Sequence, residues 1–365
     1  MSEWQTFCLK DLGKIVGGAT PLTNNPKNYG NKIAWITPKD LSTLQGRYIK
    51  KGSRSISRLG FKSCSCVLLP KHAILFSSRA PIGYVAIAEK RLCTNQGFKS
   101  IIPNKKIYFE FLYYLLKYHK DNISNIGGGT TFKEVSGATL GLFEVKIPPT
   151  YYEQQKIART LSILDQKIEN NHKINELLHT LAYKIYEYYF KYKPKNAKLE
   201  QIIIENPKSS IMVKNAQKTQ DKYPFFTSGD NILSYPKAII DGRNCFLNTG
   251  GNAGIKFYVG KASYSTDTWC ICANEFSDYL YLLLSSIKNH INQSFFQGTS
   301  LKHLQKNLLK KYPIYMPSAH EIKKFNQIMM PLLTLISINT RISKKLEQIR
   351  DFLLPLLLKQ QVKPK

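Results

Sequence analysis

The stretch that decides the fold is Tyr151–Phe190, with the sequence YYEQQKIARTLSILDQKIENNHKINELLHTLAYKIYEYYF. Its apolar residues recur mostly at alternating steps of four and three, namely Ile157, Leu161, Leu164, Ile168, Ile174, Leu178, Leu181 and Ile185. This spacing predicts a helix that packs lengthwise against another helix. At 1.5 Å per residue the helix is about 60 Å long, and few globular cores accommodate such a length. It therefore needs a long apolar partner.

A second copy of the pattern supplies that partner. Phe325 lies 168 positions after Ile157, and the other apolar residues have counterparts at the same distance, namely Met329, Leu332, Ile336, Ile342, Leu346, Ile349 and Leu353. The one irregularity is copied too, because both stretches take two steps of three, through Asn171 and through Asn339. A shared irregularity indicates an internal duplication. The simplest prediction is an intramolecular coiled coil.

The segments before the two long stretches also repeat. Tyr223–Asp230 occupies the place of Trp35–Asp40, and Gly298–Leu304 repeats Gly129–Val135. We therefore predict an α/β (α+β) chain with two similar globular domains, each followed by a long helix. The predicted boundaries are 1–150 for the first domain, 151–193 for its helix, 194–320 for the second domain, and 321–365 for the second helix and tail. The basic, serine-studded stretch Arg47–Arg58 has no recognisable counterpart in the second copy and is predicted to be an exposed loop.

The charge of the chain indicates a polyanionic partner. Lys and Arg number 53 against 24 Asp and Glu, a formal net charge of +29, in a chain that also carries 22 Tyr and 18 Phe. So many aromatic residues argue against disorder, and so much positive charge favours phosphate binding. The alternative is a generally basic proteome. With no apolar run near 18 residues and no leader pattern, we expect a cytoplasmic protein without a membrane partner. We interpret the seven cysteines as packed small hydrophobes rather than as a zinc site.

Three stretches carry a resemblance to a known family. Gly129–Lys156 and Gly298–Lys324 resemble the GST-x-K…IPLPPLxEQ segment of the specificity subunits of type I restriction-modification systems. Ser77–Ala86, SSRAPIGYVA, resembles the TRGxxIGxVAI strand and turn of the same family's target recognition domains. The order of domain, helix, domain and helix extends the resemblance over essentially the whole chain. The second copy departs most, because Pro331 interrupts its long helix and brings the straightness of that helix into question.

The resemblance implies both an architecture and a function. Two target recognition domains would each read one half of a bipartite site in double-stranded DNA. The two helices would form an antiparallel, pseudo-twofold coiled coil that sets the gap between the halves. The expected partners are two modification subunits and restriction/translocase subunits. The subunit itself would be non-catalytic and would hold no cofactor, since the methyl donor and ATP are expected on the partners.

The missing motifs agree with a non-catalytic subunit. An adenine methyltransferase needs an Asp/Asn-Pro-Pro-Tyr/Phe motif, whereas Pro148-Pro149 is preceded by Lys146-Ile147 and followed by Thr150. The sequence has no P-loop lysine and no HExxH pair. Two rivals remain open, namely a coiled-coil scaffold or adaptor without sequence-specific DNA readout, and an enzyme with unfamiliar motifs.

The candidate DNA-contacting residues are cations, amides and hydroxyls on predicted loops, because these side chains bind phosphates and base edges. In the first domain they are Arg47, Lys50, Lys51, Arg54, Arg58, Arg79, Asn95, Gln96, Thr130, Thr131 and Lys133. In the second domain they are Lys214, Lys218, Lys222, Arg243, Asn248, Asn252, Thr266, Asp267, Thr299, Ser300 and Lys302. The alternatives are a solvated loop at Arg47–Arg58, a structural role for Arg79, and turn-capping roles for the Thr and Ser residues.

Asn171 and Asn339 are predicted to fix the register of the helices. A polar residue in an apolar seam costs stability, but a slipped pairing would bury each amide without a partner. If the helices pair antiparallel about a pseudo-twofold axis, these two side chains should lie close together in the seam. The alternative is that both face solvent beside it.

Overall fold

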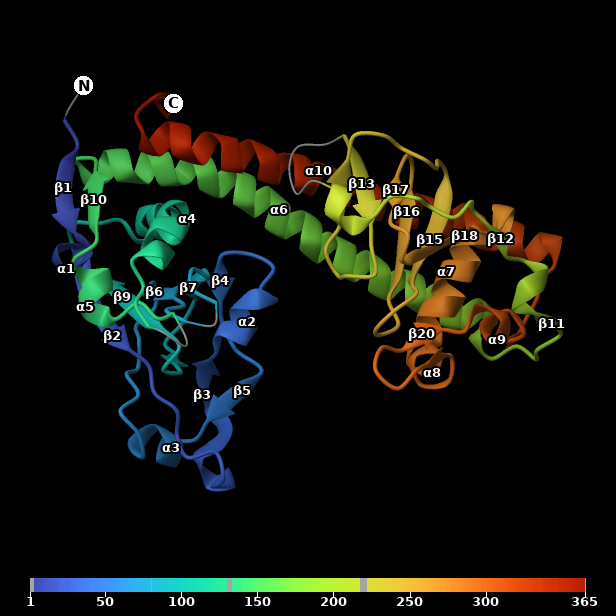
Figure 1. Ribbon diagram of the computed structural model, residues 1–365, viewed down its shortest axis with the longest axis horizontal. Helices are drawn as coiled ribbons and strands as arrows, with labels where there is room; N and C mark the ends of the chain where they lie inside the picture. Colours follow the sequence, from blue (N-terminus) through green and yellow to red (C-terminus); the bar gives the residue numbers. More distant parts are fainter. Residues whose placement is uncertain (1–2, 80, 130–132, 217–221, 365) are drawn as a thin grey trace. The chain divides into compact units, whose positions relative to one another are not determined.

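The computed structural model describes residues 3–79, 81–129, 133–216 and 222–364 (Figure 1). The chain forms two compact units. The first comprises Met1–Asn170 with Lys345–Lys365, and the second comprises Asn171–Lys344. Each unit therefore contains one globular domain and a part of each long helix, so the compact units cut across the helices and do not end where the helices begin.

The first unit contains a five-stranded sheet in the order β2-β9-β6-β7-β4 and a three-stranded sheet in the order β5-β3-β8. The strands are β2 (Gly13–Gly17), β9 (Lys99–Pro103), β6 (Ile74–Phe76), β7 (Val85–Ala88), β4 (Tyr48–Ile49), β5 (Arg54–Ile56), β3 (Tyr29–Ile36) and β8 (Cys93–Thr94). A further pair joins β1 (Gln5–Cys8) to β10 (Glu144–Ile147). The helices of the domain are α1 (Leu9–Leu12), α2 (Pro38–Ser42), α3 (Arg58–Lys62), α4 (Phe109–Asn125) and α5 (Gly137–Gly141).

The core of the first unit lies between the large sheet and α4. Apolar residues of β6, β7 and β9 point into it, and the consecutive residues Phe111–Leu116 of α4 are all buried there. A helix that is apolar on every side is buried on every side, and the long helices cover the remaining face of α4 through Ile157 and Leu161. α4 is therefore the element through which the domain is attached to the long helices.

The second unit repeats this topology. Its sheets run β12-β18-β15-β16 and β14-β13-β17, with β11 paired to β21 and β19 paired to β20. The strands are β11 (Ala197–Lys198), β12 (Ile204–Glu205), β13 (Tyr223–Phe226), β14 (Leu233–Tyr235), β15 (Arg243–Asn248), β16 (Ile255–Val259), β17 (Ser263–Tyr264), β18 (Thr268–Cys272), β19 (Phe296–Gln297), β20 (His303–Leu304) and β21 (Pro313–Ile314). The helices are α7 (Ser277–Ser286), α8 (Lys288–Ser294) and α9 (Lys306–Lys310). In both units the small sheet has one parallel pair, β3 with β8 and β13 with β17. Among the residues that the structure describes, the large sheet of the second unit has no counterpart of β4.

The long helices are α6 (Tyr151–Tyr186), which continues as a short π-helix (Glu187–Lys191), and α10 (Ala319–Leu358). α6 follows Pro148-Pro149, and the hydroxyl of Thr150 accepts a hydrogen bond from the N–H of Glu153 at 3.2 Å. At the start of α10, Ser318 and Glu321 bond each other's backbone N–H groups, which is a capping box. Pro331 does not end α10, which is continuous from Ala319 to Leu358, so the predicted interruption does not occur.

The two long helices pack together in antiparallel fashion. In the first unit Ile157 and Leu161 of α6 share a core with Leu354 and Leu357 of α10. In the second unit Asn171 pairs with Ser343, and Asn175 pairs with Asn339. Partner numbers in α10 fall as numbers in α6 rise, which defines the antiparallel direction.

The predicted seam is wrong at four of its positions. Ile174 and Leu181 of α6 and their copies Ile342 and Ile349 of α10 are each about 40–50% exposed. Polar side chains, among them Asn171 and Asn339, occupy the contact between the helices near the shared irregularity. The apolar repeat therefore marks two faces of each helix, one in the seam and one that faces outward.

Candidate nucleic-acid interface

In the first unit, four chain segments meet at one end of the strands. The backbone N–H of Ser78 donates to the carbonyl of Gly97 at 2.8 Å, and the N–H of Val135 donates to the carbonyl of Ser78 at 3.0 Å. Gly18 lies so close that a Cβ there would be 2.1 Å from the carbonyl oxygen of Asn95. We call this group, made of Gly18–Thr20, Ser77–Arg79, Asn95–Gly97 and Glu134–Val135, the first loop cluster.

Arg79, Asn95 and Gln96 all belong to the first loop cluster. The guanidinium of Arg79 is 3.6 Å from one carboxylate oxygen of Glu134. The other oxygen of Glu134 binds the ammonium of Lys99 at 3.2 Å. The side chain of Asn95 accepts from the N–H of Gly97, and Gln96 is exposed and accepts from the hydroxyl of Thr20. Arg79 thus forms an ion pair within the cluster while 37% of its side chain remains exposed.

The segment Arg47–Arg58 is not the loop that we predicted. It contains β4 and β5, and Arg58 is the first residue of α3. Lys50, Lys51, Arg54 and Arg58 are exposed as expected, and the guanidinium of Arg54 lies 4.0 Å from the ring centre of Tyr29. Arg47 is different, because only 3% of it is exposed. The structure therefore removes Arg47 from the candidate DNA contacts.

Asp40 anchors the backbone of the turn that follows the exposed lysines. Its carboxylate accepts hydrogen bonds from the N–H groups of Thr37 and Ser53, both at 2.7 Å, so the turn after Lys50 and Lys51 is tied to the start of α2. Burial acts to raise the pKa of Asp40, but the bonds from Ser53 and Thr37 outweigh it and lower that pKa. Asp40 is not among the residues predicted from the sequence.

The second unit brings together the equivalent segments, which we call the second loop cluster: Thr227–Asp230, Asn248–Asn252, Ser265–Asp267 and Gln297–His303. The Thr249 hydroxyl donates to the carbonyl of Asp267 at 2.7 Å, and the N–H of Gly251 donates to the carbonyl of Lys302 at 2.9 Å. Lys256 supports the cluster from β16, since its ammonium donates to the carbonyls of Thr227 at 2.7 Å and Gly229 at 2.6 Å. Nothing in the local sequence of Lys256 indicated that role.

Most second-domain candidates are exposed, namely Lys214, Lys222, Asn252, Thr266, Thr299, Ser300 and Lys302, and Asp267 is half-buried. The N–H of Thr266 donates to the carbonyl of Ile211, which brings the segment of Lys214 beside the cluster. Lys133 of the first domain is exposed as well. Thr130, Thr131 and Lys218 lie outside the described residues.

Two second-domain candidates are held inside the fold, since Asn248 is buried and the side chain of Arg243 is only 16% exposed. The amide of Asn248 donates to the carbonyl of Asn252 at 3.1 Å and so closes its own turn. Arg243 forms a two-pronged ion pair with Asp278, with N–O distances of 2.6 and 2.7 Å. These bonds use the guanidinium of Arg243 and one N–H of the Asn248 amide within the domain itself.

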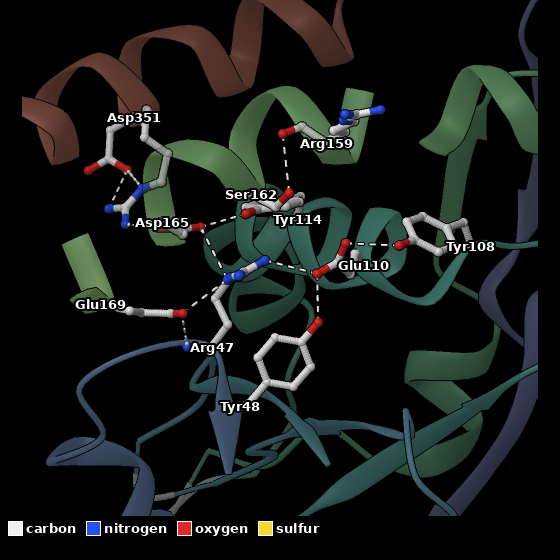
Figure 2. Close-up of polar contacts among 11 residues, drawn as sticks. Arg47, Tyr48, Tyr108, Glu110, Tyr114, Arg159, Ser162, Asp165, Glu169 and Asp351 are labelled. Carbon is white, nitrogen blue, oxygen red and sulfur yellow. Dashed lines mark hydrogen bonds and ion pairs between the residues drawn. The ribbon is translucent and has the colours of Figure 1, made fainter. Parts of the chain in front are cut away.

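Figure 2 shows where Arg47 lies instead. Its guanidinium bonds Glu110 of α4 at 2.9 Å and Glu169 of α6 at 3.1 Å. Asp165 of α6, 4.0 Å away, is held in turn by Arg350 of α10 at 2.7 Å and by the hydroxyl of Tyr114 at 2.5 Å. Burial acts to lower the pKa of Arg47, but the charges and hydrogen bonds of Tyr114, Glu169 and Glu110 outweigh burial and raise it.

Both predicted register residues form hydrogen bonds between the long helices. Asn171 donates to the hydroxyl of Ser343 at 3.2 Å, and Asn339 donates to the side-chain oxygen of Asn175 at 3.0 Å. Ser343 lies 168 positions after Asn175, so the two bonds are related by the same offset as the two copies. Each asparagine therefore bonds the residue one turn away from the other asparagine, rather than the other asparagine itself.

Among the described residues, no group of three or more His, Cys, Asp or Glu side chains is placed to hold a metal ion. In the same part of the chain, no helix is long and apolar enough to cross a membrane. All seven cysteines are free.

The fold defines a class of duplicated proteins, in which two copies of one α+β domain are attached to a shared antiparallel helix pair. The model of the type I restriction modification DNA specificity domain matches residues 1–180 and again 195–348. The chain belongs to this family and is a type I specificity subunit with two recognition domains.

Known relatives agree with the assignment. The type I restriction enzyme MjaIX specificity subunit of Methanocaldococcus jannaschii is 33% identical over 97% of this chain and 92% of its own length. The HindI specificity subunit of Haemophilus influenzae is 30% identical over 46% of this chain and 37% of its own length. The crystal structure of the type I restriction-modification S subunit from M. genitalium matches 98% of this chain and 96% of its own with a TM-score of 0.63. At 18% identity, that likeness concerns the fold.

Proposed function

We propose that each globular domain reads one half of a bipartite site in double-stranded DNA. The observation that carries the proposal is that both units share one topology apart from β4, whereas the side chains of the two loop clusters differ. Where the first cluster has Arg79 and Glu134, the second has Gly250 and His303. One scaffold with two sets of loop side chains suits two recognition tasks.

The exposed cations support the electrostatic part of this binding. Flexible lysines neutralise phosphates, while amides and arginines can bond base edges. The residues that remain available for these roles are Lys50, Lys51, Arg54, Arg58, Arg79, Asn95, Gln96, Lys133, Lys214, Lys222, Asn252, Thr266, Asp267, Thr299, Ser300 and Lys302. They include side chains of both domains, which agrees with one half-site per domain.

The long helices would set the gap between the half-sites. A slip of one heptad would move the domains by about 10 Å at 1.5 Å per residue. That is roughly three base pairs at 3.4 Å each. Asn171 and Asn339 would resist such a slip, because it would break their inter-helix hydrogen bonds and leave the buried amide of Asn339 without its partner. An Asn171→Leu, Asn339→Leu double variant that keeps both its stability and a single methylation gap would contradict this role.

The chain would act without catalysis of its own, in a complex with two modification subunits and with restriction/translocase subunits. Exposed apolar side chains on the long helices, among them Leu177 on α6 and Phe352 on α10, support the docking of partner helices. The methyl donor and ATP would bind to the partners.

The decisive experiment mixes the purified chain with modification subunits, DNA and a methyl donor. A specificity subunit supports methylation only in the complex and only at one bipartite sequence. Methylation by the chain alone would identify an enzyme. Methylation by the modification subunits that does not depend on this chain or on DNA sequence would identify the chain as a scaffold. Sequencing the methylated DNA identifies both half-sites and the gap.

A further inference from the structure

Each unit contains an arginine that joins its globular domain to its long helix. In the first unit Arg47 bonds Glu110, in the first turn of α4, and also Glu169 of α6. In the second unit Arg243 bonds Asp278, in the first turn of α7, and also Thr334 of α10 at 2.9 Å. Each arginine therefore bridges two elements that the apolar core alone would leave free to rotate slightly against each other.

The acids on the domain side are copies of one another, but the arginines are not. Asp278 lies 168 positions after Glu110, and both are buried, with exposed fractions of 2% and 9%. Arg47 comes from the turn before β4, which has no counterpart among the described strands of the second unit, whereas Arg243 is the first residue of β15. The two copies thus reach the same bridge from different places in the chain, and such agreement points to a shared requirement.

That requirement is better explained by geometry than by stability. A buried ion pair is weak evidence for stability, because removing both charges from water costs about as much as their attraction returns. The planar guanidinium of an arginine, however, donates its hydrogen bonds only in fixed directions, whereas apolar side chains can shift against one another without losing a directed bond. The Glu169 carboxylate also bonds the backbone N–H of Arg47 at 2.9 Å, so it holds the main chain of the domain as well as the side chain.

DNA recognition at a fixed gap needs such a constraint. Changing the gap by one base pair moves a half-site by about 3.4 Å and turns it by about 35° around the duplex. A domain that rocked on its helix through a large part of that angle would engage sites with the wrong gap. Resting on the function proposed above, we infer that Arg47 and Arg243 are positioning residues that fix the angle of each recognition domain on its long helix and so restrict methylation to one gap length.

The test uses the full chain assembled with modification subunits. Methylation rates are measured on duplexes with both half-sites intact and the gap lengthened or shortened by one base pair. The variants are Arg47→Met and Arg243→Met, which keep the apolar stem without the fork, and Glu169→Gln, a milder change that retains an acceptor for the Arg47 backbone N–H. Lys184→Met is the matched control, because it removes an exposed ion pair with Glu187 on the same helix as Glu169.

We expect each arginine variant to reduce the preference for the native gap over its neighbours by about tenfold or more. Discrimination against base changes within the half-sites should stay as in the wild type, which a general loss of folding would not preserve. Glu169→Gln should give a smaller loss of gap preference, and Lys184→Met none. If an arginine variant fails to assemble, the other arginine variant and Glu169→Gln decide the matter.

The two proposals can fail separately. A wild-type complex that methylates without regard to sequence or gap would overturn the proposed function. A wild-type complex with one strict gap, together with variants that keep that gap, would overturn only the positioning role. Arg47→Lys gives an additional test, since it keeps the charge but not the fork. Full retention of the gap preference in Arg47→Lys would show that charge alone is sufficient and would contradict the geometric argument.

Discussion

The two units share their strand order but anchor their domains to the long helices with different chemistry. The first uses two arginines and three buried or half-buried carboxylates, Glu110, Asp165 and Glu169. The second uses Arg243 and Asp278 with neutral partners, including the hydroxyl of Thr334 and the carbonyl of Met330. At the positions 168 after Asp165 and Glu169 stand Leu333 and Ser337. The comparison teaches that the duplicated scaffold has kept its topology while the side chains at the anchoring contact have been replaced.

The loop clusters differ in the same way. Glu134 balances Arg79 and Lys99 in the first, whereas exposed His303 faces Gly250 in the second. The first cluster therefore carries an Arg–Glu ion pair where the second cluster has a glycine and a histidine, and the charges of the second cluster, at Asp230, Asp267 and Lys302, lie at other positions. Half-sites read by the two domains should accordingly differ in sequence and not form a palindrome.

The largest expected effect comes from exchanging 1–170 for the matching part of another family member. The methylated site should change completely in one half and remain unchanged in the other, because the second loop cluster stays intact. Sequencing of the methylated DNA measures the result. Changes in both halves, or in neither, would contradict the assignment of one domain to one half-site.

The second prediction compares the buried acids. Asp278→Ala should lower the free energy of unfolding by about 3–5 kcal/mol, because it leaves Arg243 mostly buried without a charged partner. Glu110→Ala should cost less, because Glu169 still pairs with Arg47. Chemical denaturation of both variants measures the difference. An equal or reversed order would show that the extra carboxylates of the first unit do not compensate for one another.

The third prediction separates exposed cations from the buried arginine. Replacing Lys50 and Lys51 by Gln should weaken DNA binding for all sequences. It should also reduce the slope of log affinity against log salt by about 1 for each phosphate contact that is lost. Arg47→Met should leave the slope unchanged, since Arg47 is buried. Binding titrations at several salt concentrations test this, and a reduced slope for Arg47→Met would restore Arg47 as a DNA contact.

The smallest expected effect concerns Asp40. Its folded-state pKa is lowered, so its stabilisation is fully present above the unfolded value, near 3.8, and is lost as the pH falls through the folded value. Asp40→Asn should therefore cost about 1 kcal/mol at pH 7, the usual value for a helix cap. Its cost should shrink below about pH 3.8. Denaturation at both pH values measures this, and a cost that is independent of pH would mean that the charge is not involved.

Periodicity made the duplicated architecture predictable, because a helical stripe and its copy are local properties of the sequence. The burial of Arg47 could not be predicted in the same way, since Glu110 and Glu169 lie 63 and 122 positions away. A basic, serine-rich segment has the same composition whether it is a solvated loop or a strand edge. One usable signal was available, namely that the acid at Glu110 recurs at Asp278, although both precede apolar runs where a charge is unexpected.

The bond between Arg47 and Glu169 also has a consequence for heredity. A recombination junction at the start of α6 would take Arg47 from one parent and Glu169 from the other. The domain could then lack the carboxylate on α6 that binds Arg47. A junction after Asn170, where the N-terminal segment of the first compact unit ends, keeps Arg47, Glu110 and Glu169 in one inherited piece. The segment that recombination can exchange with this anchor intact is thus the domain together with about five turns of the helix that follows it.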